Sequence, residues 1–135
     1  MNEPLFLTLD DVLQFHADQI ELAGGDGAIL DIGKIESAIA QPNATWDGQF
    51  LHEDLAAMAA AYLFHIVQNH GFADGNKRTG VNAAIVFLEL NGYALNWPVD
   101  ESEQIVLGVA KGELSKNEVA EFIRRLISEQ GGSGI

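Results

Sequence analysis

A chain of 135 residues with 47% hydrophobic and 20% charged residues has the size and composition of one globular domain with a hydrophobic core. Its net charge of −13 argues against general binding to nucleic acids or anionic membranes, because both require a basic face. The lack of cysteine excludes disulfides, thiolate metal sites and a cysteine nucleophile.

The sequence predicts neither a signal peptide nor a membrane span. Residues 1–4 have neither the basic start nor the apolar run of a signal peptide. The longest apolar run, Leu55 to Phe64, is ten residues long and too short to span a bilayer. We therefore expect a cytoplasmic protein without a membrane partner. Residues 1–130 are expected to form a single domain, and the Gly-rich residues 131–135 a flexible tail.

Apolar residues recur at helical spacing through most of the chain, and the start and stop signals divide it into about six helices. Thr8, Asp31 and Ser115 are suited to cap the first, second and last helix, and Gly24 with Gly25 ends the first. The predicted helices cover residues 9–23, 32–40, 52–69, 76–90, 101–111 and 116–129.

The fold class follows from these elements. Residues 52–69 contain many alanines, which predicts close packing on all sides and a central position. Residues 42–51 are predicted as a loop with Trp46 packed on the core, or else as a clamp for a partner. A short extended piece is possible over residues 93–98. Since no long stretch alternates with period two, we predict an all-α protein, a compact bundle.

The residues with chemical potential gather between the two middle helices, over residues 70–79. Two of only seven Lys and Arg residues, Lys77 and Arg78, stand side by side there, in the expected first turn of a helix. A helix N-terminus already attracts anions and repels cations, so placing both here is costly unless an anion binds. With Gly75 allowing close approach to the backbone, this pattern indicates a phosphate site.

Two neighbouring side chains have a structural reading beside the functional one. Asp74 is suited either to cap the following helix or to bind Mg²⁺ together with phosphate oxygens. His70 is suited either to cap the preceding helix or to act as a general base near neutral pH. Asn82, one helical turn after Arg78, is either an added phosphate donor or a polar flank residue.

The other histidines, His16, His52 and His65, form no metal pattern and are expected to be structural or solvated. Phe72 is expected to anchor the loop in the core.

The stretch 70–79, HGFADGNKRT, resembles the signature loop of the Fic/Doc family. Lys77, where most Fic proteins have Gly, is the mark of the Doc (death on curing) branch. Residues 82–92 and the segment from Gly24 to Ala38 also fit that branch, so the resemblance covers about residues 7–128.

The resemblance implies a compact all-α toxin of a bacterial or phage toxin–antitoxin pair. Its loop would bind ATP and Mg²⁺, and the γ-phosphate would pass to a threonine of elongation factor Tu, which halts translation. In this chain His70 would be the base and Asp74 the Mg²⁺ ligand. The phosphate-binding residues would be Gly75, Asn76, Lys77 and Arg78, with Asn82 assisting.

Three departures from the family pattern shape this expectation. Fic enzymes that transfer AMP usually have a second Arg where this chain has Val81, so phosphate transfer is favoured over AMP transfer. Gly71 replaces the Pro or bulky residue often found after the histidine, which predicts a looser loop. The chain lacks the self-inhibitory helix motif of some Fic proteins, so inhibition would come from a Phd-like antitoxin.

Two further alternatives stay open. A catalytically inactive relative would only bind the antitoxin. A helix-turn-helix reading DNA would use Lys77 and Arg78, but the charge of −13 and the shortage of cations on the second helix oppose it, and no DNA binding by the chain alone is expected.

Overall fold

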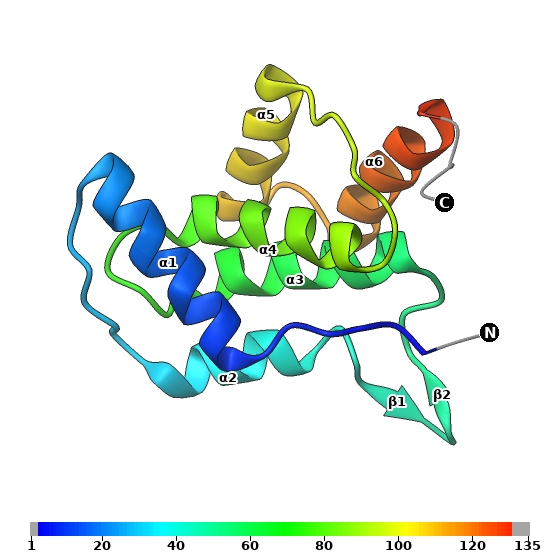
Figure 1. The fold of residues 1–135 in the computed structure, drawn as a ribbon, viewed down its shortest axis with the longest axis horizontal. Coiled ribbons are helices and arrows are strands. Elements are labelled where there is room, and N and C mark those ends of the chain that lie inside the picture. The colour runs from blue at the N-terminus through cyan, green and yellow to red at the C-terminus, as the bar shows by residue number, and fades with distance from the viewer. Residues whose placement is uncertain (1–2, 131–135) are drawn as a thin grey trace.

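Within the residues described by the computed structural model, 3–130, the chain forms six α-helices and one small hairpin (Figure 1). The predicted tail, residues 131–135, lies outside the described residues. The all-α prediction is confirmed. The elements are α1 (Leu9–Ala23), α2 (Ile32–Ala40), β1 (Thr45–Trp46), β2 (Gln49–Phe50), α3 (Leu55–Asn69), α4 (Asn76–Leu90), α5 (Val99–Ala110) and α6 (Lys116–Glu129).

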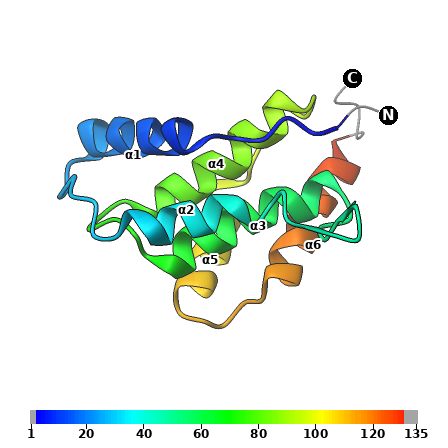
Figure 2. The same cartoon turned by 90° about the horizontal axis from the view of Figure 1, so that it is seen from below.

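The alanine-rich helix α3 is the centre of the fold, as predicted. Helices α2, α4, α5 and α6 pack around it, and α1 packs on α4 (Figures 1 and 2). Gly80 of α4 permits the closest approach, because a Cβ there would lie 2.9 Å from Val67 Cγ2 and 3.1 Å from the Leu63 carbonyl oxygen. The crossing of α3 and α4 fixes the positions of the two helix ends that the loop 70–75 joins.

The helix ends follow the predicted capping residues with a few corrections. Thr8, Asp31 and Ser115 cap α1, α2 and α6 through their side chains. Helix α3 begins at Leu55, three residues later than predicted, because Asp54 accepts a hydrogen bond from the Ala57 amide and acts as its N-cap. Helix α5 covers residues 99–110, beginning two residues before the predicted start and ending one residue before the predicted end.

Residues 42–51 differ from the prediction, because they contain an antiparallel hairpin. Thr45 pairs with Phe50 and Trp46 with Gln49, and successive pairs face opposite sides. Phe50 packs against the core, so Trp46 on the next pair points outward and is 77% exposed. The prediction of a packed Trp46 is therefore wrong. The hairpin precedes the N-terminus of α3, and roughly 22 Å of helix separates it from the loop after α3 (Figure 1).

The predicted extended piece, residues 93–98, pairs with no strand of the described chain. Its backbone instead bonds a side chain: Gln130 Oε1 accepts from the Asn96 amide at 2.8 Å, and Gln130 Nε2 donates to the Asn96 carbonyl at 2.7 Å. No helix within residues 3–130 is long and apolar enough to cross a membrane.

Candidate functional site

The loop between α3 and α4 begins at His70, which is exposed and ends α3 in the left-handed conformation, with φ 51° and ψ 52°. A side chain rarely adopts this backbone conformation, and such strained residues cluster at functional sites. In the described chain the other non-glycine residue with positive φ is Asp47, which the hairpin turn explains. The left-handed turn at His70 reverses the chain and leaves the imidazole at the surface.

A short extended segment after α1 anchors the loop. The amides of Leu30 and Asp31 both donate to the Gly71 carbonyl, at 2.8 and 3.1 Å, and the Ala73 amide donates to the Ala28 carbonyl at 3.0 Å. Gly71 is buried, and a Cβ there would lie 2.5 Å from Ile35 Cγ1. The expectation that Gly71 loosens the loop is therefore wrong, because the loop packs tightly against Ile35 at this glycine.

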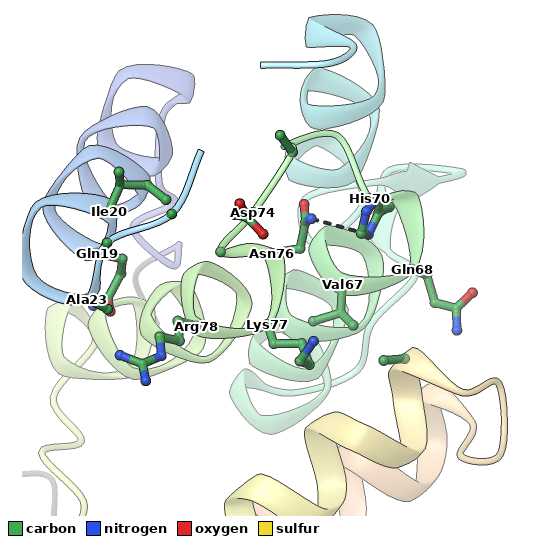
Figure 3. Close-up of a pocket in the computed structure, with 15 residues that line it drawn as sticks. Gln19, Ile20, Ala23, Val67, Gln68, His70, Asp74, Asn76, Lys77 and Arg78 are labelled. Carbon is green, nitrogen blue, oxygen red and sulfur yellow. Dashed lines mark hydrogen bonds between the residues drawn. The ribbon is translucent and has the colours of Figure 1, made fainter. Parts of the chain in front are cut away.

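Asn76 is 5% exposed and holds the loop together with its side chain. Its Oδ1 accepts from the Phe72 amide at 3.0 Å, and its Nδ2 donates to the Phe72 carbonyl at 2.9 Å and to His70 Nδ1 at 3.2 Å (Figure 3). These contacts leave the backbone amide of Asn76, rather than its side chain, as the group able to meet a phosphate. Phe72 is fully buried, as predicted.

Asp74 does not cap α4, so the structural reading of this residue is wrong. The N-cap is Gly75, in a left-handed conformation with φ 84°, and no side chain caps the helix. The Asp74 Oδ2 instead accepts from the Asp26 amide at 2.7 Å. Its Oδ1 has no hydrogen-bond partner within residues 3–130, so one carboxylate oxygen remains available to a cation.

The first turn of α4 is open and positively charged. The first of its amides to be bonded within the described chain is that of Thr79, to the Gly75 carbonyl at 2.9 Å. The amides of Asn76, Lys77 and Arg78 therefore remain free for a ligand. Lys77 and Arg78 are exposed, and neither forms an ion pair with a carboxylate of residues 3–130. This confirms the unbalanced charge that their sequence positions indicated.

One hollow of about 620 Å³ brings most of the predicted site residues together (Figure 3). His70 and Asp74 meet the first turn of α4 there, facing the C-terminal end of α1. Its lining consists of Gln19, Ile20, Ala23, Gly24, Gly25, Val67, Gln68, His70, Ala73, Asp74, Gly75, Asn76, Lys77, Arg78 and Ala110.

Asn82 is the predicted site residue that lies elsewhere. It lines a neighbouring hollow of about 630 Å³, between α4, α5 and Trp97. Lys77, Arg78 and Gln19 border both hollows. Asn82 therefore lies about one helical turn beyond the N-terminus of α4, on the side of the helix.

The three remaining histidines separate into two groups. His65 lies on α3 with its Nε2 3.1 Å from Lys116 Nζ, and burial, followed by the charges of Lys116 and His52, lowers its pKa to about 4. Burial and the charge of Lys116 also lower the pKa of His52. His16 is different: it is 3% exposed and its Nε2 lies 2.8 Å from the carbonyl oxygen of Asp74, which lines the hollow. The sequence signal for the burial of His16 was its spacing: it follows Val12 by four residues and so lies on the same, inner face of α1.

These residues fit a nucleotide with a metal ion. Three free amides and two unpaired cations suit phosphate oxygens, and the glycine at the N-cap keeps the backbone accessible. No group of three or more His, Cys, Asp or Glu within residues 3–130 could hold a metal ion by itself. Asp74 would therefore share Mg²⁺ with phosphates and water, which is the usual arrangement for this ion.

Comparison with known proteins places these features in a family. The model of the Fic/DOC family matches residues 6–88. "Protein kinase doc" of Escherichia phage P1 is 32% identical over 117 residues, which cover 87% of this chain and 91% of that protein. "Toxin Doc" of Mycolicibacterium smegmatis is 36% identical over 99 residues, covering 72% and 76% of the two chains. With the matched region containing the whole loop and the open α4 N-terminus, the chain belongs to the Fic/Doc family.

Proposed function

We propose that the chain is the toxin of a toxin–antitoxin pair and that it transfers the γ-phosphate of ATP, with Mg²⁺, to a hydroxyl of a target protein. The observation that carries this proposal is the open first turn of α4, where free amides and the unpaired Lys77 and Arg78 border the same hollow as His70 and Asp74. The relatives named as a protein kinase and as a toxin support it. The membership of the Fic/Doc family supports a transferase.

Each residue has a role in this reaction. The amides of Asn76, Lys77 and Arg78, with the two cationic side chains, would hold and align the phosphates. Asp74 would hold Mg²⁺, which would neutralise phosphate charge, and ATP would supply the phosphoryl group. His70 takes the proton of the attacking hydroxyl. Asn82, in the neighbouring hollow, is proposed to assist from the side of α4.

The Asn76 contact determines how His70 can act as a base. An amide nitrogen only donates, so His70 Nδ1 accepts from Asn76 Nδ2 and the neutral ring carries its proton on Nε2. If His70 accepts a proton at Nδ1, that nitrogen no longer accepts from Asn76 and the contact is lost. If it accepts a proton at Nε2 instead, the ring must first be the tautomer with its proton on Nδ1, and this proton also displaces Asn76. Proton transfer to His70 therefore requires this contact to open.

The substrate and the inhibitor are proposed by family resemblance. Elongation factor Tu is the proposed target and its threonine hydroxyl the acceptor. A Phd-like antitoxin is the proposed inhibitor. Because both ATP and a translation factor are found in the cytoplasm, we propose that the protein acts there.

The deciding experiment follows the label of ATP. The protein is incubated with Mg²⁺, elongation factor Tu and ATP labelled at either the γ- or the α-phosphate. Transfer of the γ-label, lost in His70→Ala, is the expected result. Transfer of the α-label would establish AMP transfer instead, and no transfer of either label would contradict the proposed reaction.

The toxin assignment is tested separately in cells. Induced expression of the wild-type chain is expected to arrest growth, and His70→Ala is expected to relieve the arrest at equal protein level. Normal growth with the wild type present as folded protein would contradict the toxin assignment.

A further inference from the structure

We infer that His16 is a positioning residue, which holds the Asp74–Gly75 turn so that the Asp74 carboxylate faces a bound Mg²⁺. The inference rests on the proposed function, because it assigns His16 a role in the same site. It concerns a side chain that comes from α1 and lies outside the loop 70–79.

His16 makes a directed contact with the backbone of the turn. Its Nε2 lies 2.8 Å from the Asp74 carbonyl oxygen. A carbonyl only accepts, so Nε2 must be the donor and must carry a proton. The ring is 3% exposed, so water has little access to replace this donor.

The ring is itself fixed by the loop that it supports. It stacks on Phe72 with a centroid separation of 3.7 Å and an interplanar angle of 9°. A Cβ on Gly75 would lie 3.3 Å from His16 Cδ2 and 3.6 Å from its Nε2. The imidazole therefore stacks on Phe72 before Asp74 and lies close to the position that a side chain at residue 75, after Asp74, would occupy.

These contacts orient the carboxylate indirectly. The contact with His16 turns the Asp74 carbonyl toward α1. In this orientation the Asp74 side chain accepts a hydrogen bond from the Asp26 amide through Oδ2, at 2.7 Å, and Oδ1 has no partner within residues 3–130. The same peptide group begins the left-handed Gly75 turn, from which the free amides of α4 follow. Loss of the His16 donor would free this peptide to rotate, and the carboxylate would lose its fixed direction.

Two substitutions separate positioning from simple packing. His16→Phe keeps an aromatic ring on Phe72 but removes the donor. His16→Gln keeps an N–H donor but removes the ring. If His16 only fills space, His16→Phe is expected to impair Mg²⁺ binding less than His16→Gln does. If His16 positions Asp74, His16→Gln is expected to impair Mg²⁺ binding less. His65→Phe is the matched control, since His65 is a partly buried histidine with one ring-nitrogen contact, to Lys116, away from the hollow.

The test measures ATP affinity by calorimetry, with and without Mg²⁺, for the wild type and these three variants after their folding is checked by circular dichroism. We expect His16→Phe to lose about 10–100-fold of the affinity gained from Mg²⁺, the usual effect of removing a partner that orients a metal ligand. His16→Gln is expected to retain more of this gain, His65→Phe all of it, and ATP affinity without Mg²⁺ is expected to change little.

The outcomes distinguish this inference from the proposed function. A normal Mg²⁺ gain in His16→Phe, or an equal loss of ATP affinity with and without Mg²⁺, overturns the inference and leaves the proposed function intact. A wild type that does not bind Mg²⁺ and ATP overturns both.

If His16→Phe does not fold, NMR of the wild type decides. The His16 Nε2–H resonance is expected to be protected from exchange and to shift when Mg²⁺ is added to the ATP-bound protein. A resonance that is unaffected by Mg²⁺ overturns the inference.

Discussion

Helices α3 and α4 are equally long and lie side by side, but their N-termini are built in opposite ways. At α3, the Asp54 side chain caps the helix and also receives two hydrogen bonds from Arg124, at 2.8 and 3.1 Å. At α4, the N-cap is a glycine with no side chain to offer, and Lys77 and Arg78 stand in the first turn without an ion pair in the described chain.

This difference separates structural polar residues from functional ones. Burial alone would raise the pKa of the Asp54 carboxyl, but the hydrogen bonds from Arg124 and Ala57, with the charge of Arg124, hold that pKa below its usual value. The Asp54 carboxylate at the α3 end is thus satisfied within the protein. At the α4 end, the helix dipole opposes the two cations. A bound anion would remove this conflict.

The largest expected effect is that of His70→Ala on the α4 side. Removing a general base lowers a rate by roughly 10²–10⁴-fold, so γ-phosphate transfer is expected to fall by this factor. Affinity for ATP is expected to remain, because the imidazole does not hold the phosphates. Initial rates and calorimetry check the two parts, with His65→Ala as the control. A variant that transfers phosphate at the wild-type rate would exclude His70 as the base.

On the α3 side, Asp54→Ala is expected to lower the free energy of unfolding by about 1–2 kcal/mol. Most of this loss comes from the helix cap, since a half-exposed ion pair with Arg124 adds little. Urea unfolding measures the change. Affinity for ATP is expected to stay at the wild-type value, and a weakened affinity would mean that the two helix ends are coupled.

Glu53→Ala is the matched control for this change. Glu53 is 83% exposed and lies 3.8 Å from Arg124 without capping the helix, so its removal is expected to leave stability nearly unchanged.

An effect of pH on stability is also expected, through His65 beside the N-terminus of α6. In the folded protein its pKa is lowered to about 4 by burial and then by the charges of Lys116 and His52. Because the unfolded chain takes up this proton first, at its ordinary pKa of about 6.5, stability is expected to fall as the pH drops from about 6.5 toward 4. Urea unfolding across this range is expected to show a shallower fall in His65→Phe. An equal fall in both proteins would exclude His65 as a source.

Much of this comparison could be predicted from sequence, because it depends on local patterns. The caps at Thr8, Asp31 and Ser115 and the cations at Lys77 and Arg78 are read from neighbouring residues, and the structure confirms their positions. The alanine-rich pattern of α3 likewise predicted the central helix.

The parts that failed depend on contacts between distant residues. Of the two readings of Asp74, the helix cap is wrong, because its carboxylate bonds the amide of Asp26, 48 residues earlier. His16 was expected to be structural or solvated, and the local sequence could not show its contact with a carbonyl 58 residues away. Gly71 was predicted to loosen the loop, and its packing against Ile35 of α2 could not be seen in the local sequence.

The most direct measurement compares thermal unfolding of the wild type and the double variant Lys77→Ala/Arg78→Ala, each with and without saturating ATP and Mg²⁺. Without ligand, the variant is expected to be as stable as the wild type or slightly more stable, by about 0.3–1 kcal/mol for each cation removed from the helix N-terminus. With ligand, the wild type is expected to gain stability, by about 2.7 kcal/mol at a hundredfold excess over Kd, and the variant to gain far less. A wild type that nucleotide does not stabilise, or a variant stabilised to the same extent, would contradict a phosphate site at the start of α4.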